Sequence, residues 1–264
     1  MLKLLLKKQL TEIFRNYFYN PKKNRARSKA GIIGYILLFV IIMVGILGGM
    51  FTALSLTLCA PLSAAGMDWL YFSLMGLLAI LLGTFGSVFN TYSCLYLSRD
   101  NDLMLSLPIP VNVLMASRLL TVYLMGAMYS IVVILPAVIV YWIAVSASAG
   151  AIFGCLLLML LISVFVLTLS CALGWVVAKI SLKLKNKSFI TVIISLAFFG
   201  GYYFFYFKAQ TLIQNLLANA ADYAAKIKGA AYPLYLFGKV GTGDWLAMLM
   251  VSAVVIALFA IVWA

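Results

Sequence analysis

Long apolar runs separated by short polar or basic segments form the main pattern along this chain. A membrane-spanning helix needs about 20 mostly apolar residues. Six runs reach that length, and their cores contain no Asp, Glu, Lys or Arg. The pattern therefore predicts an all-α integral membrane fold, with six transmembrane helices over residues 32–58, 69–92, 113–145, 151–177, 189–207 and 245–264.

Individual residues add detail to the second and third helices. Arg118 lies near the start of the third, where a long side chain is expected to extend to the membrane surface. Pro136 is expected to kink the same helix, because proline removes a backbone N–H. Small residues recur at four-residue spacing in the second helix and predict a close contact with another helix, from this chain or from a second copy. These residues are Ala79, Gly83, Ser87 and Thr91.

The first 30 residues differ in character from the rest of the chain. Apolar positions from Leu2 to Phe18 recur at helical spacing with basic residues between them. They predict a basic amphipathic helix over residues 2–18 on the cytoplasmic membrane surface, which Pro21 is expected to end. The alternative is a basic tail that only sets the topology. We assign residues 1–30 to this interfacial helix and a basic linker, and residues 31–264 to the six-helix transmembrane domain.

The connection between the second and third helices, residues 98–112, is too apolar for a merely solvated loop. Ser98 or Asp100 can cap a short helix there, and Pro108 and Pro110 are expected to stop it. An apolar, capped segment with two acids favours docking on a partner protein. The alternative is a loop packed against its own helix ends.

The longest connection, residues 208–244, has apolar residues at helical spacing followed by a second apolar stretch. It predicts one or two short helices that dip into the outer leaflet, since a plain surface loop does not need so many apolar residues. Residues 238–243 contain the letters of a phosphate-binding loop in the wrong order. We expect a flexible turn there.

The distribution of charge predicts the orientation in the membrane. The chain has 19 Lys and Arg against 6 Asp and Glu, a net charge of +13. Nine of the basic residues lie in residues 1–30, two in the second connection, four in the fourth and four in the fifth. Positive charge stays on the cytoplasmic side, so a cytoplasmic N-terminus, which places 15 of the 19 inside, is predicted. We therefore expect membrane lipids as partners and no nucleic acid.

The composition excludes several classes of protein. The chain is 66% apolar and 9% charged, against about 45–50% and 25% in soluble domains, which excludes an ordinary soluble enzyme. Histidine is absent, which removes the commonest metal ligand and general base. The four cysteines show no C-x-x-C pairing and are interpreted as small apolar residues. We expect no catalytic residue, metal or cofactor, so the protein acts passively or receives energy from a partner.

Taken together, these features resemble the type-2 ABC exporter permeases. Those proteins have an interfacial N-terminal helix, six spans, a cytoplasmic coupling helix between spans two and three, and an external re-entrant segment between spans five and six. Residues 99–110, R-D-N-D-L-M-L-S-L-P-I-P, are similar to the D-L-L-L-S-L-P-I stretch of permeases from Gram-positive bacteria. The layout covers essentially the whole chain, and the similar segment runs on to Leu120.

The resemblance implies a multi-pass protein of a bacterial plasma membrane, the permease subunit of an ATP-driven exporter. A separate ABC ATPase subunit would bind its cytoplasmic face, with the helix over 2–18 as a second contact. A second permease half, as another copy, another chain or a fused half, would complete the export path. Because the chain stops at Ala264 without a basic tail, we expect the N-terminal half of a longer permease. The residues implied in ATPase coupling are Arg99, Asp100, Asp102, Leu103, Leu105 and Leu107.

Two other classes of protein stay open. A passive channel or facilitator would need a continuous polar stripe through several helices, which the sequence does not show. A non-transport membrane protein, such as an immunity or assembly factor, would not need a docking segment for an ATPase.

Overall fold

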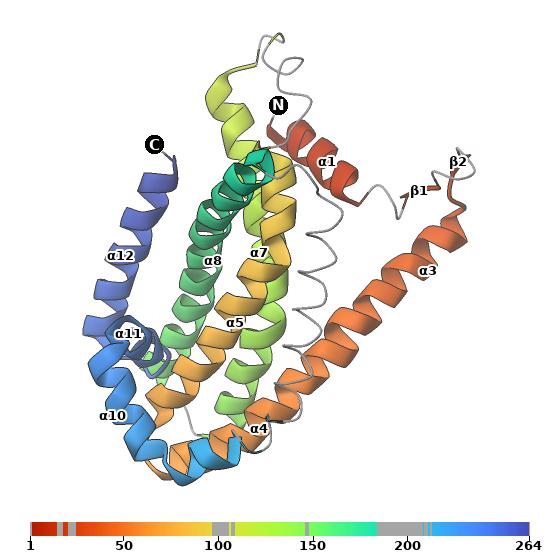
Figure 1. Cartoon of the computed structure of the whole chain (residues 1–264). Coiled ribbons are helices and arrows are strands. Elements are labelled where there is room, and N and C mark those ends of the chain that lie inside the picture. The colour runs from red at the N-terminus through yellow and green to blue at the C-terminus, as the bar shows by residue number, and fades with distance from the viewer. Residues whose placement is uncertain are drawn as a thin grey trace.

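The structure, a computed structural model, describes residues 2–14, 18–20, 25–96, 106, 109–145, 148–183, 208, 211 and 213–263 (Figure 1). This part of the chain is all-α apart from one two-residue strand pair, and it contains five helices long and apolar enough to cross a membrane. The predicted span at 189–207 lies outside the described residues. The five helices are Lys29–Ala64, Asp68–Tyr96, Val111–Ala144, Ala149–Ile180 and Trp245–Trp263.

The N-terminal region begins with the expected amphipathic helix. Helix α1 (Leu2–Ile13) ends earlier than the predicted residue 18. Strands β1 (Tyr19–Asn20) and β2 (Arg25–Ala26) then pair antiparallel. Ser28 caps the next helix, since its side chain accepts a hydrogen bond from the Gly31 backbone N–H at 3.3 Å.

The first spanning helix consists of α3 (Lys29–Val40), the π-helical η1 (Ile41–Gly48) and α4 (Gly49–Ala64). It extends away from the other helices near its start and joins them through α4 (Figure 1). No residue of α3 is buried, and its surface consists mostly of large apolar side chains. A helix that is apolar all round and exposed in this way is suited to contact with lipid or with other helices.

A tight turn reverses the chain between the first and second spans. Gly66 has a φ of 68°, a conformation that glycine adopts without steric cost, and the Met67 N–H bonds back to the Leu62 carbonyl at 2.9 Å. Helix α5 (Asp68–Thr91) then begins with an acid in its first turn, where the helix dipole favours negative charge. The π-helical η2 (Tyr92–Tyr96) ends this span.

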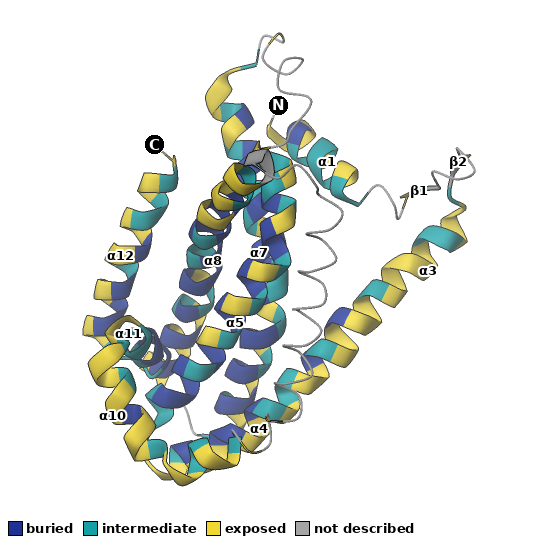
Figure 2. Cartoon of the chain, viewed as in Figure 1, coloured by how far each residue is buried: buried dark blue, intermediate teal, exposed yellow. Residues whose placement is uncertain are grey.

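The core of the molecule lies where α5, α7 (Val111–Ala144) and α8 (Ala149–Lys183) pack together. Buried residues concentrate on these three helices (Figure 2). Helix α7 continues through Pro136 to its end. Arg118, which was expected to extend to the membrane surface, is 7% exposed and therefore buried within the protein.

In the described C-terminal part, residues 213–218 are helical, and α10 (Ala220–Ala230), α11 (Tyr232–Gly241) and α12 (Trp245–Trp263) follow. Short helices were predicted within 208–244 and are confirmed. Helix α11 packs against α5, α8 and α12 rather than lying on the surface. It lies at the end of the bundle opposite to α1 (Figure 1), and we call these two ends the α11 end and the α1 end.

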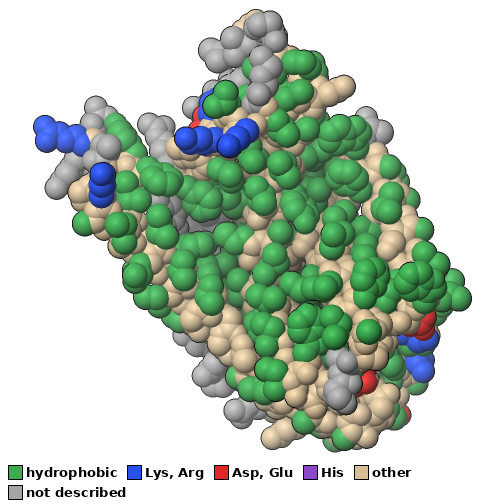
Figure 3. Space-filling model, turned by 180° about the vertical axis from the view of Figure 1, so that it is seen from behind, with side chains coloured by type: hydrophobic (Ala, Val, Ile, Leu, Met, Phe, Trp, Pro, Cys, Tyr) green, Lys and Arg blue, Asp and Glu red, His purple; other side chains and the backbone are tan. Residues whose placement is uncertain are grey.

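The outer surface agrees with a membrane environment. Hydrophobic side chains cover the middle of the molecule, while basic and acidic side chains gather toward the two ends (Figure 3). Lysine–aromatic pairs occur at both ends: Lys179 Nζ lies 4.6 Å from the Trp175 ring centre at the α1 end, and Lys228 Nζ lies 5.4 Å from the Trp69 ring centre at the α11 end. Such residues favour the two membrane–water interfaces. The chain is thus an all-α, multi-pass membrane protein.

Candidate functional site

The small-residue stripe of α5 lies where α5 packs against α7 and α8 in the core. Ala79, Gly83, Ser87 and Thr91 are all buried and face α7 and α8. A Cβ atom on Gly83 would come within 3.0 Å of the Val166 side chain of α8 and 3.1 Å of Ser130 of α7. The stripe therefore serves contacts within this chain.

Hydrogen bonds in this contact form both between helices and within α5. The Ser87 and Ser170 hydroxyls lie 2.7 Å apart and join α5 to α8. Thr91 donates back to the Ser87 carbonyl at 2.9 Å, while the Thr84 hydroxyl is buried without a hydrogen-bond partner. This polar cluster is enclosed by close packing on all sides, so it stabilises the helix contact and does not line a pathway in the described chain.

At the α1 end, α1 is attached to the beginning of α7. Gln9 donates to the Ser117 hydroxyl at 3.2 Å and accepts from the Thr121 hydroxyl at 2.7 Å. Leu5 and Leu114 form a small buried cluster beside these bonds. The amphipathic helix is therefore fixed to a spanning helix by specific contacts in addition to any membrane binding.

The predicted coupling residues belong next to this attachment in sequence, because α7 begins at Val111. The coupling residues themselves lie outside the described residues. They are Arg99, Asp100, Asp102, Leu103, Leu105 and Leu107. The structure therefore describes the helix that receives this segment, together with α1 packed on it.

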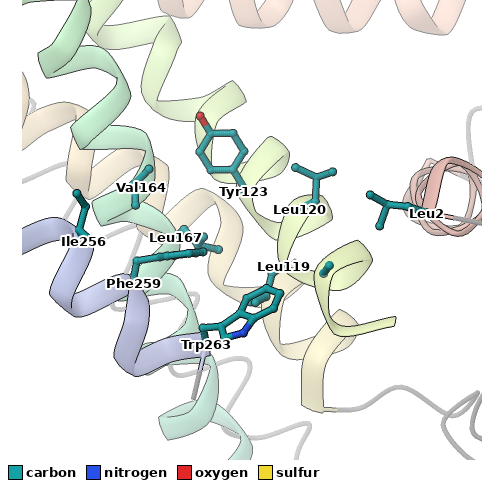
Figure 4. Close-up of a pocket in the computed structure, with 10 residues that line it drawn as sticks. Leu2, Leu119, Leu120, Tyr123, Val164, Leu167, Ile256, Phe259 and Trp263 are labelled. Atoms are coloured by element: carbon teal, nitrogen blue, oxygen red, sulfur yellow. The ribbon is translucent and has the colours of Figure 1, made fainter. Parts of the chain in front are cut away.

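A groove of about 460 Å³ opens between α1, α7, α8 and α12 at the α1 end (Figure 4). Its lining is apolar and aromatic throughout. Leu2 of α1 points toward Leu120 of α7, while Phe259 and Trp263 of α12 form the opposite wall (Figure 4). No sequence pattern predicted this groove, since its residues come from four helices far apart along the chain.

At the α11 end, backbones approach closely. A Cβ atom on Gly238 of α11 would collide with the Trp69 carbonyl oxygen of α5, and one on Gly154 of α8 would collide with the Val240 carbonyl oxygen. The Ser73 hydroxyl donates to the Leu234 carbonyl at 2.9 Å, which joins α5 to α11. Glycine is needed here for close packing.

The expectation of a flexible turn over residues 238–243 is therefore wrong for most of that stretch. Gly238, Val240 and Gly241 are helical and buried. Only the last residues turn, and Gly243 there has a φ of 90°. The glycines of residues 238–243 were interpreted as turn formers. Helices that pack with their backbones close together also need glycine, so the residue type alone does not distinguish the two cases.

Charged groups outside the spans gather beside α11. Lys239 Nζ donates to Asp244 Oδ2 at 2.6 Å, and Asp244 Oδ1 accepts from the Leu246 N–H at 3.1 Å. The hydrogen bond from Lys239 holds the pKa of Asp244 below its ordinary value, and the same bond raises the pKa of Lys239. Asp244 thus caps α12 and binds Lys239 at the same time.

A second polar cluster lies inside the α11 end. The Tyr141 hydroxyl donates to Asp68 Oδ2 at 3.3 Å, and the Tyr71 hydroxyl donates to the Ala137 carbonyl at 2.8 Å. Asp68 Oδ1 and Trp142 Nε1 are buried without hydrogen-bond partners. These groups join α5 to α7.

Metal-ligating groups do not cluster in the described part of the chain, where no three His, Cys, Asp or Glu side chains come together. Cys59, Cys155 and Cys171 are buried free thiols, and Cys94 is half-buried.

Comparisons with known protein families, with curated proteins and with solved structures give no match for this chain.

Proposed function

We propose that this chain is the membrane-spanning permease subunit of an ATP-driven type-2 ABC exporter in a bacterial plasma membrane. It forms part of the substrate pathway, does not hydrolyse ATP itself, and couples to a separate ATPase subunit at the α1 end. The resemblance of residues 99–120 to such permeases supports this function, as do the short helix packed against the spans at the α11 end and the amphipathic helix at the other end.

The observation that carries the proposal is the attachment of α1 to α7 through Gln9. The two proposed ATPase contacts are α1 and the segment at residues 98–112. Both are joined to the first turns of α7, one by hydrogen bonds and the other by the chain itself. A displacement of either contact therefore acts on the same 34-residue helix.

Helix α7 is suited to carry such a displacement through the membrane. It packs against α5 and α8 along the core and reaches the α11 end, where Tyr141 contacts Asp68. Coupling through a membrane protein requires a rigid element that contacts both ends and has two arrangements. The proposal assigns this role to α7, with a second permease half completing the pathway.

The test is recovery of an ATPase subunit with this chain from native membranes in mild detergent. The test variant carries Asp100→Ala, Asp102→Ala and Leu105→Ala. The matched control carries Asp222→Ala, Tyr223→Ala and Lys226→Ala, which are exposed on α10 at the opposite end. We expect the control to recover the ATPase as the unchanged chain does, and the test variant to recover about tenfold less or none.

Two results would contradict the proposal. If the test variant recovers as much ATPase as the unchanged chain does, residues 98–112 do not form the contact with the ATPase. Absence of any ATPase, with the chain intact and other partners retained, would favour a passive facilitator or a non-transport membrane protein.

A further inference from the structure

The groove at the α1 end runs along two spanning helices and is lined by apolar and aromatic side chains. It runs from Ala116 to Tyr123 on α7 and from Ile256 to Trp263 on α12. Seven helical steps on each side give a length of about 10 Å at 1.5 Å per residue. The groove holds about 460 Å³.

Its length of about 10 Å is shorter than one leaflet of a membrane. The hydrocarbon core is about 30 Å thick, so one leaflet accounts for about 15 Å. The groove begins beside α1, where Leu2 and Trp263 line it, and reaches Val164 in the middle of α8 (Figure 4). The first part of an acyl chain that enters from the membrane surface beside α1 and runs parallel to the helices fits this length and this apolar lining.

The charges next to the groove favour an anionic headgroup. Lys3 follows the groove-lining Leu2 directly, and Lys7 lies one turn further along α1; both are exposed. Like charges at this spacing destabilise an isolated helix, and a bound anion relieves their repulsion. Lys8, on another side of α1, is paired with Glu12 at 3.5 Å.

We propose that the groove binds one acyl chain of an anionic membrane phospholipid, whose headgroup is held by Lys3 and Lys7. The lipid enters from the leaflet at the α1 end, which the charge distribution predicts to be cytoplasmic. It fills the space between α12 and α7 and fixes α1 against both. This inference does not rest on the proposed function, because it needs only the chain and a membrane.

The experiment is a lipid titration of the purified, delipidated full chain in detergent, followed by native mass spectrometry. The probes are dioleoyl phosphatidylglycerol, which is anionic, and dioleoyl phosphatidylcholine, which has the same chains and no net charge. We expect one phosphatidylglycerol per chain, bound at least tenfold more tightly than phosphatidylcholine. A lysine beside an anionic lipid contributes up to about a fivefold gain in binding.

Two variants separate the parts of the site. Ala116→Trp fills the groove and should weaken phosphatidylglycerol binding at least tenfold, while Met115→Trp, on the exposed side of the same helix, should leave it unchanged. The double variant Lys3→Gln/Lys7→Gln lies on the exposed surface of α1 and does not disturb packing. It should weaken phosphatidylglycerol binding several-fold and leave phosphatidylcholine binding unchanged, whether or not Ala116→Trp folds.

Equal affinity for the two lipids would overturn the proposal, as would phosphatidylglycerol binding that neither Ala116→Trp nor the lysine variant changes. A dimer that Ala116→Trp converts to monomer, with lipid binding unaffected, would assign the groove to a second copy of the chain instead.

Discussion

The two ends of the helical bundle are held together in different ways. At the α11 end, glycines allow the backbones of α5, α8 and α11 to touch, so that the contact has no room for an added methyl group. At the α1 end, α12 leaves an apolar groove beside α7, and α1 is attached mainly through Gln9 and Leu5. The first kind of contact resists displacement, whereas the second is formed by side chains that can separate.

This difference indicates which end is able to move. Elements with few buried contacts open at lower free energy than elements in a closely packed core. The α1 end is therefore the suitable end for a partner or a lipid to act on, and the α11 end is the suitable fixed point. The variants below alter one end at a time.

The largest effect is expected for Gly238→Ala at the α11 end. The added methyl group would collide with the Trp69 carbonyl oxygen, which cannot move away without shifting α5. Overpacking a core by a methyl group costs about 1–3 kcal/mol, and more where the obstacle is backbone. We expect a loss of at least about 3 kcal/mol, measured as the free energy of unfolding in detergent.

Gly229→Ala is the matched control, because nothing lies within 4 Å of the added Cβ on α10. Alanine in a helix is favoured over glycine, so the control should be unchanged or more stable by up to about 1 kcal/mol. Equal stability of the two variants would show that the α11 end is not closely packed.

A smaller effect is expected for Gln9→Ala at the α1 end. It removes both hydrogen bonds that join α1 to α7. Interhelical hydrogen bonds in membrane proteins contribute about 0.6 kcal/mol each on average. The free energy needed to detach α1 from α7 should fall by about 1 kcal/mol. Amide hydrogen exchange over residues 2–13 should therefore be about fivefold faster.

Thr11→Ala is the control for this measurement, since the Thr11 hydroxyl is exposed and bonds only within α1. Thr11→Ala should leave amide exchange unchanged. Gln9→Ala should accelerate exchange in α1 and leave α11 unaffected. Unchanged protection of residues 2–13 in Gln9→Ala would mean that other contacts hold α1.

The smallest effect is expected for Asp244→Asn, which keeps a capping side chain for α12 but removes the charge that pairs with Lys239. The pKa of Asp244 is lowered, so the stabilisation is present above its unfolded value of 3.8 and is lost as pH falls through the folded value. The pKa of Lys239 is raised above 10.5, so its contribution is lost only as pH rises above that range.

Both side chains are about one-third exposed, which limits the gain to below about 1 kcal/mol. The measurement compares the unfolding free energies of the unchanged chain and the variant at pH 7 and at pH 3. At pH 7 the unchanged chain should have the larger free energy of unfolding, and at pH 3 its advantage over the variant should be smaller. The same difference at both pH values would exclude the ion pair as its cause.

The sequence predicts the spanning helices well, because a long apolar run needs no tertiary contact to be recognised. The run predicted at 113–145 corresponds to α7 at Val111–Ala144, and the run at 245–264 to α12 at Trp245–Trp263. The four small residues of α5 also lie at a helix contact, since small residues at four-residue spacing share one face.

What the sequence pattern does not reveal depends on contacts between distant segments. Gly238 was predicted to lie in a turn because glycine permits turns and close packing alike. Arg118 was expected at the surface because the pattern of apolar residues does not show that this side chain is buried in the folded chain. Gln9 offered a signal, since it is a polar residue on the otherwise apolar face of the amphipathic helix, opposite hydroxyl residues spaced by four on α7.

The central claim is that the two ends lie on opposite sides of the membrane, with the α1 end in the cytoplasm. It is tested most directly by labelling single cysteines in intact cells with a membrane-impermeant maleimide. The background carries Cys94→Ala, because the other three native thiols are buried. Asp222→Cys on α10 should be labelled in intact cells, and Lys3→Cys on α1 only after permeabilisation. Labelling of Lys3→Cys in intact cells, with Asp222→Cys protected, would contradict the account.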